Sequence, residues 1–78
     1  MSDEIIAPIY EKILEIMRSH GGDEEPVYIG VIHGSLLAHF PNGISEEEVR
    51  SILEEMCYIG LVEDCSANFP GSFYRTRT

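Results

Sequence analysis

A turn followed directly by a helix-capping signal, near the middle of the chain, constrains the fold more than any other feature of the sequence. Residues 41–43 (Pro-Asn-Gly) are a strong turn signal. Ser45 and Glu48 then form a capping box, in which each side chain accepts a hydrogen bond from a free backbone N–H at the start of a helix. A helix is therefore predicted over 46–59, and Gly60 is predicted to end it with a left-handed backbone.

Two further helices are predicted before this turn. Apolar residues recur at three- and four-residue spacing over 5–19, with Pro8 tolerated in the first turn and a glycine pair at 21–22 as the stop. A second, shorter helix is predicted over 30–40, although Gly34 weakens it by about 1 kcal/mol relative to alanine. The side chains expected to face inward are Ile6, Ile9, Tyr10, Ile13, Leu14 and Met17 in the first helix, Ile32, Leu36, Leu37 and Phe40 in the second, and Val49, Ile52, Leu53 and Met56 in the third.

The hydrophobic period changes from helical to strand-like after Gly60. Strands are predicted over 61–65 and 72–77, and Pro70-Gly71 between them fits the centre of a type II turn. A short third strand is expected over 27–29. Three helices followed by a two-stranded antiparallel wing is the order of an α+β winged helix-turn-helix. A chain of 78 residues holds one such domain at most, so a single winged-helix domain is predicted over 1–78.

Two stretches of the sequence resemble known domains. Residues 43–53 (GISEEEVRSIL) resemble the third helix of winged-helix domains, and 58–62 (YIGLV) followed by 72–76 (SFYRT) is similar to the end of the C-terminal winged helix of the middle subunit of replication protein A. The resemblance covers about residues 43–78. It implies a module that binds peptides of DNA replication and repair proteins through an acidic surface. The wing loop departs from the family pattern, because 67–71 (ANFPG) stands where the family has acidic residues.

The charge of the chain bears on what it can bind. There are 14 acidic residues against 5 basic ones, a formal net charge of −9. The segment 46–55, which would be the recognition helix of a DNA-binding member, holds five glutamates and one arginine. Tight DNA binding uses roughly 6–10 contacts between phosphates and Lys or Arg. We therefore expect weak or no DNA binding by the isolated monomer.

The leading hypothesis is a non-enzymatic protein-interaction module that docks a basic helical segment of a partner on an acidic face. Phe69, beside Pro70 at the loop tip, either anchors the partner or packs back across the hairpin. Because the family's acidic wing loop is missing, Glu63 and Asp64 are the acidic residues left at the wing base. The predicted partner-binding residues are Glu54, Glu55, Glu63, Asp64 and Phe69.

The alternative hypothesis is a dimeric winged-helix transcriptional regulator that binds DNA through Arg50, Arg75 and Arg77. Arg75 and Arg77 alternate along the last strand and should point to the same side, and a wing arginine can reach a minor groove. A homodimer would double this basic patch. A third interpretation is a subunit that folds fully only within a larger assembly, for which an exposed apolar patch would argue.

The remaining chemistry-bearing residues predict no catalytic or metal site. His33, His39, Cys57 and Cys65 lack the spacing of a zinc finger, and no order of Ser, His and Asp or of Cys and His suggests a nucleophile. We expect no cofactor and no enzymatic activity. No apolar run approaches the ~20 residues of a membrane span, and the acidic start of the chain lacks the basic region of a signal peptide. A cytoplasmic or nuclear protein with reduced cysteines is therefore expected.

Overall fold

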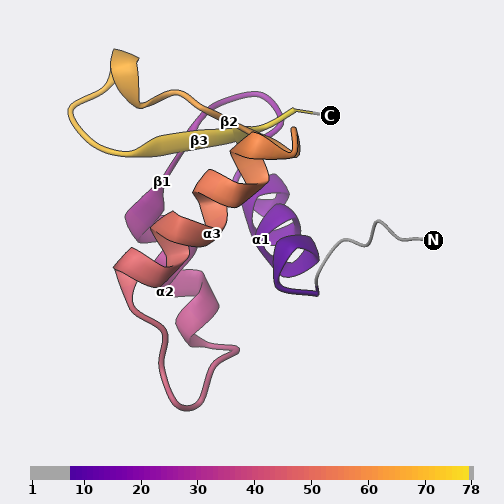
Figure 1. Ribbon diagram of the computed structural model, residues 1–78, viewed down its shortest axis with the longest axis vertical. Helices are drawn as coiled ribbons and strands as arrows, with labels where there is room; N and C mark the ends of the chain where they lie inside the picture. Colours follow the sequence, from indigo (N-terminus) through magenta and orange to yellow (C-terminus); the bar gives the residue numbers. More distant parts are fainter. Residues whose placement is uncertain (1–7, 78) are drawn as a thin grey trace.

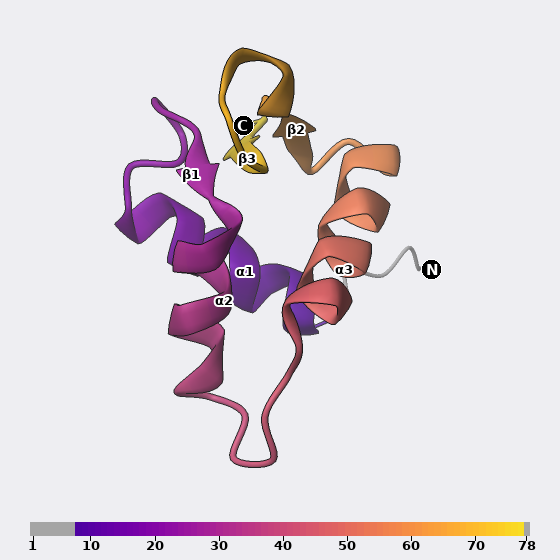
Figure 2. The same ribbon diagram turned by 90° about the vertical axis from the view of Figure 1, so that its left-hand side faces the viewer.

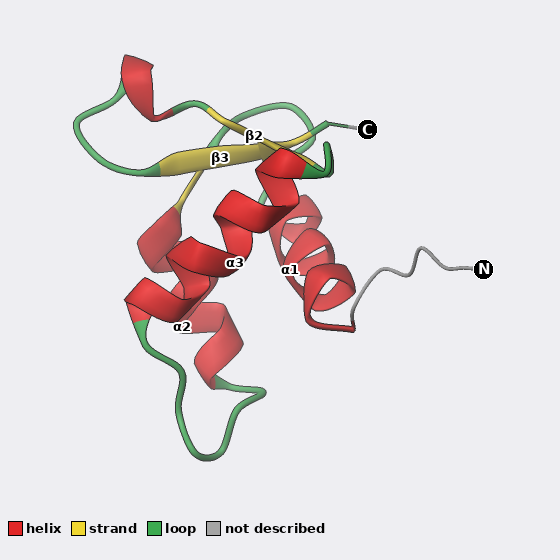
Figure 3. Cartoon of the chain, in the orientation of Figure 1, coloured by secondary structure: helices red, strands yellow, loops and turns green. Residues whose placement is uncertain are grey.

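The computed structural model describes residues 8–77, and this part of the chain is an α+β fold of three α-helices and one three-stranded antiparallel sheet (Figure 1). The sheet lies across one end of the helices, and the connection between the second and third helices lies at the opposite end (Figure 3). In chain order the elements are α1 (Pro8–Ser19), β1 (Val27–Tyr28), α2 (Ile29–Leu37), α3 (Glu46–Tyr58), β2 (Val62–Asp64), a short 3₁₀ helix (Ser66–Asn68) and β3 (Phe73–Thr76).

The first helix follows its apolar pattern and ends where the glycines predict. Its buried residues are Ile13, Leu14, Ile16 and Met17. Gly21 has a φ of 78°, in the left-handed region that glycine adopts without strain, and the next residue's N–H returns to the Met17 carbonyl. The expected start of this helix at residue 5, and the inward position of Ile6, lie outside the described residues.

The second helix is shorter than predicted, and one of its expected core residues is exposed. It ends at Leu37 rather than at residue 40, and Leu37 is 44% exposed. The buried stripe is set by Ile29, Ile32 and Leu36, at spacings of three and four residues. Leu37 lies one further residue, about 100°, around the helix and so points away from the core. Phe40, beyond the helix end, is half-buried against the core.

The third helix is capped at both ends as the sequence predicts, although it ends one residue early, at Tyr58. The Glu48 N–H donates to Ser45 Oγ at 3.1 Å, and the Ser45 N–H donates to Glu48 Oε1 at 2.9 Å. Gly60 has a φ of 87°. Its N–H and that of the next residue bond back to the carbonyls of Cys57 and Met56, which is a Schellman motif. The helix direction is therefore fixed locally at both ends.

The strands pair in the order β1-β3-β2, with both ladders antiparallel. Val62 lies opposite Thr76, and Val27 lies opposite Tyr74; all four side chains are buried on the face that covers the helices. The third strand expected over 27–29 is present at Val27–Tyr28, while the following residue already begins α2. Below this sheet in Figure 2, α2 packs against both α1 and α3.

The connection between β2 and β3 is not the predicted type II turn. That turn needs a positive φ at its third residue, and Gly71 does not adopt one. Instead Asp64 Oδ1 accepts the Ser66 N–H at 2.8 Å and starts the 3₁₀ turn. Ser66 Oγ then accepts the Phe73 N–H at 3.0 Å. Side-chain oxygens of Asp and Ser thus replace the backbone geometry that proline and glycine were expected to supply.

One apolar core joins the three helices and the sheet. Its buried side chains come from all three α-helices and all three strands, and they are Ile13, Leu14, Ile16, Met17, Val27, Ile29, Ile32, Leu36, Val49, Leu53, Met56, Val62 and Tyr74. Ile52, expected to be fully inside, is only half-buried. In the part of the chain that the structure describes, no helix has both the length and the apolar content to cross a bilayer.

Candidate functional site

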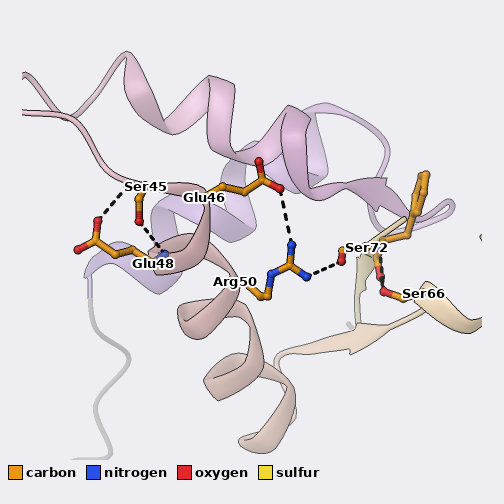
Figure 4. Close-up of polar contacts among 7 residues, drawn as sticks. Ser45, Glu46, Glu48, Arg50, Ser66 and Ser72 are labelled. Atoms are coloured by element: carbon orange, nitrogen blue, oxygen red, sulfur yellow. Dashed lines mark hydrogen bonds and ion pairs between the residues drawn. The ribbon is translucent and has the colours of Figure 1, made fainter. Parts of the chain in front are cut away.

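The glutamates of the N-terminal half of α3 (residues 46–51) have structural roles. Glu46, Glu47 and Glu48 occupy the first turn, where the helix dipole favours negative charge. Glu48 closes the capping box, and Glu46 Oε2 lies 3.7 Å from the Arg50 guanidinium. Figure 4 shows these contacts side by side along the helix start. This half of the helix is therefore acidic for reasons of folding.

The C-terminal half of α3 (residues 52–58) presents a different surface. Its last turn carries an acidic residue and no basic one, so its charge opposes the helix dipole. Tyr58 is 92% exposed, and Ile59 directly after the helix is 52% exposed. Glu54 and Glu55 lie between these apolar residues and the middle of the helix, and both are exposed. Acidic and apolar side chains thus share one surface at this end.

A hollow of about 450 Å³ lies beside this surface, between α1 and α3. Glu55 is held at its rim, because the Tyr10 hydroxyl donates to Glu55 Oε1 at 2.7 Å. This hydrogen bond, and then burial and the nearby negative charge, raise the pKa of Tyr10. We call this depression the α1–α3 hollow; its lining residues are Tyr10, Ser51, Glu54, Glu55, Tyr58 and Ile59.

Three of the predicted acidic contacts surround one cysteine. Burial raises the pKa of the Cys57 thiol, and the charges of Asp64, Glu54 and Glu63 raise it further. Burial also raises the pKa of Tyr74, again with contributions from Asp64 and Glu54, while Arg50 acts in the opposite direction. Glu63 and Asp64 belong to β2, which packs against α3, and Glu63 lies opposite Arg75 of β3 in the sheet.

Phe69 does not belong to this acidic neighbourhood. Its ring stacks on Phe73 with centroids 4.4 Å apart, and Phe73 in turn lies 5.3 Å from Tyr28. Phe69 remains 40% exposed, so it both packs back across the hairpin and shows one face to solvent. Tyr28 and Phe73 are cross-strand partners on the outer face of the sheet. The five predicted partner-binding residues therefore divide into one acidic group and one separate aromatic cluster.

The arginines of the DNA-binding alternative are engaged within the chain at two of three positions. Arg50 donates to Ser72 Oγ at 2.8 Å and pairs with Glu46, so it ties α3 to the hairpin (Figure 4). Arg75 donates to the Asp23 carbonyl at 3.1 Å and is half-buried. Arg77 is exposed and lies one residue beyond β3, which ends at Thr76 rather than at residue 77 as predicted. No DNA is needed to explain the positions of Arg50 and Arg75.

Among residues 8–77, no three His, Cys, Asp or Glu side chains are arranged to hold a metal ion. His33 Nε2 bonds instead to the Ile44 carbonyl at 2.7 Å, which fastens α2 to the loop before α3. The two cysteines are free thiols, and both are half-buried. Burial and Glu63 raise the pKa of the Cys65 thiol, while Arg75 acts in the opposite direction.

Tyr58 is not among the predicted partner-binding residues, although it is 92% exposed. The signal was present, because Tyr58 lies four residues after Glu54 and seven after Ser51, on the outward side of the helix. The contribution of Tyr10 to the α1–α3 hollow depends on how two distant helices cross, which the spacing of residues does not encode.

Comparison with known proteins found no match for this chain among family models, curated proteins or solved structures.

Proposed function

We propose that this chain is a non-enzymatic winged-helix module that docks a basic segment of a partner protein on the acidic surface at the junction of α3 and β2. Three helices followed by a hairpin, with a turn between α2 and α3, support the winged-helix assignment. In that assignment α3 is the recognition helix and the β2–β3 hairpin is the wing. The module is proposed to act inside the cell, and the family resemblance of residues 43–78 points to partners in DNA replication or repair.

The observation that carries this proposal is the clustering of acidic residues around an exposed ring, at the helix end where negative charge is unfavourable. Glu54, Glu63 and Asp64 all raise the pKa of the Cys57 thiol there, and the last turn of α3 brings no basic residue. A purely solvated acidic face has no need of Tyr58, which is 92% exposed. An unfavourable charge cluster beside an exposed aromatic residue is what an interface for a basic amphipathic partner needs.

The proposal is tested with a probe peptide of about 18 residues, five turns of helix, with leucines on one face and lysines plus one arginine on the other. Titration into ¹⁵N-labelled protein should shift the amide signals of Tyr58, Ile59, Glu63 and Asp64. A matched peptide with the same leucine face and glutamates in the basic positions is expected to cause no shift. Absence of any shift at these four residues with the basic peptide would remove the proposal.

A parallel experiment addresses nucleic acid. Fluorescence anisotropy of a labelled DNA duplex is measured against the protein at low and at physiological salt, beside the mass of the protein in solution. With a net charge of −9, the monomer is expected to show no salt-sensitive binding, because few counterions would be released. Submicromolar binding that weakens steeply with salt would favour the DNA-binding alternative instead.

A further inference from the structure

We propose that the α1–α3 hollow binds one arginine side chain of the partner, and that this contact determines which basic segments are accepted. The inference rests on the proposed function and names the side chain that the surface selects. It starts from the walls of the hollow, which are mostly carbon. Tyr58 and Ile59 supply exposed apolar surface on one side, and Tyr10 supplies a second ring from α1.

The carboxylates of the hollow define the charge of its occupant. Glu54 and Glu55 both line it, and none of its six lining residues is basic. Glu55 is oriented by the Tyr10 hydroxyl at 2.7 Å, which leaves its second oxygen for another donor. The two glutamates are adjacent in sequence, so they lie on different sides of the same helical turn. Since both nevertheless line the hollow, a cation in it would meet two negative charges.

Arginine fits this combination of rings and carboxylates better than lysine. Its planar guanidinium stacks on an aromatic face and also donates in parallel to a carboxylate, and it is more weakly hydrated than an ammonium group. Its aliphatic stem packs on apolar surface such as that of Ile59. A lysine would gain the charge attraction but not the stacking on Tyr58.

The neighbouring surfaces show why this hollow, and not another, receives the arginine. The depression along the N-terminal half of α3 is lined by Ser45, Glu47, Glu48, Ser51 and Ile52, and it has no aromatic wall. The aromatic cluster of Tyr28, Phe69 and Phe73 has rings but no carboxylate among its members. Only the α1–α3 hollow, among the described surfaces, combines both.

The test compares the probe peptide with a version in which its single arginine is replaced by lysine. By calorimetry, the arginine peptide is expected to bind about fivefold more tightly, the size of a stacking contribution at a partly desolvated site. Tyr58→Ala should weaken the arginine peptide by about tenfold and the lysine peptide much less. Tyr58→Phe keeps the ring and should retain the preference. Because Tyr58 is exposed, all variants should show the circular dichroism of the original chain.

A second pair of variants separates the hollow from the rest of the acidic surface. Glu54→Gln is expected to weaken the arginine peptide, whereas Glu47→Gln, which removes the same charge from the other end of α3, should not. Equal binding of both peptides with no effect of Tyr58→Ala would overturn the arginine inference while leaving the proposed function standing. Failure of both peptides to bind would overturn both.

Discussion

The first turn of α3 carries three glutamates where a helix favours negative charge, whereas the other end carries Glu54 and Glu55 where a helix disfavours it. At the first end the carboxylates have partners within the chain, namely the backbone N–H of Ser45 and the guanidinium of Arg50. At the second end Glu55 accepts a hydrogen bond from the Tyr10 hydroxyl, and the last turn brings no basic residue. One residue type thus meets a favourable helix dipole at one end of the helix and an unfavourable one at the other.

Under the proposed function, this difference separates acidic residues that serve folding from those that would receive a basic partner. Natural domains are only marginally stable, so a charge arrangement that lowers stability without a compensating partner needs another explanation. A basic partner supplies one, because it removes the repulsion upon binding. The net charge alone does not make this distinction, since it counts both ends of α3 equally.

The largest expected effect is on the free energy of unfolding, and it compares a buried residue with an exposed one in the C-terminal half of α3. Leu53→Ala removes a fully buried side chain and should lower the free energy of unfolding by about 2–5 kcal/mol. Tyr58→Ala should change it by less than about 0.5 kcal/mol, because an exposed ring away from structural contacts contributes little. Urea denaturation followed by circular dichroism measures both. A loss with Tyr58→Ala comparable to that of Leu53→Ala would mean that the ring is structural.

The next largest effect concerns the N-terminal half. Ser45→Ala removes the side chain that accepts the Glu48 N–H and should lower the free energy of unfolding by about 1 kcal/mol. Ser51→Ala, on the exposed side of the same helix, is the control and should be neutral or slightly stabilising. Ser45→Ala should not alter binding of the probe peptide, because Ser45 is not among the residues that line the α1–α3 hollow. If Ser45→Ala is fully folded but binds the probe peptide more weakly, the two halves of α3 are not separate in function.

Much of the fold was predictable because its signals are local. The capping box at Ser45 and the left-handed Gly60 each depend on a few neighbouring residues, and both are confirmed. The prediction at Pro70-Gly71 was wrong for the opposite reason. Ser66, from the other side of the loop, binds the backbone of Phe73 and sets the path of the chain, and no two-residue turn signal contains that information.

The candidate site was predicted less completely than the fold. Glu54, Glu63 and Asp64 were expected from charge and from their places in the chain order, and the structure brings them together. Phe69 was expected beside them but stacks on Phe73 in a separate cluster. The α1–α3 hollow was not predicted, because the contact between Tyr10 and Glu55 joins residues 45 positions apart. Such contacts follow from helix packing rather than from local pattern.

Neutralising one glutamate at each end of α3 should change the free energy of unfolding by a smaller amount, with opposite signs at the two ends. Glu54→Gln should raise the free energy of unfolding by about 0.3 kcal/mol, since it relieves repulsion and the unfavourable dipole interaction. Glu46→Gln should lower it by a similar amount, because it removes a favourable dipole interaction and the ion pair with Arg50. Thermal unfolding at low salt measures both changes. In about 1 M salt, screening should reduce the difference in stability between the two variants. Equal signs for the two variants would contradict the comparison.

The smallest expected effect uses the Cys57 thiol as a local reporter of the acidic surface. Burial, Asp64 and Glu54 raise the pKa of this thiol, so Glu54→Gln should lower that pKa and speed alkylation by iodoacetamide at about pH 8. The measurement is made with Cys65→Ser in the background, so that one thiol reacts.

Glu46→Gln serves as the control in that background, because Glu46 is not among the charges that act on Cys57. Since the folded-state pKa of the thiol is raised, its contribution to stability is fully present below the ordinary thiol pKa of about 8.5. That contribution is lost as the pH rises through the folded-state pKa, and in Glu54→Gln the loss should be smaller and should be complete at a lower pH. Equal alkylation rates for the two glutamine variants would mean that the carboxylate of Glu54 does not act on this end of the helix, and that the C-terminal half of α3 is not the more negative one.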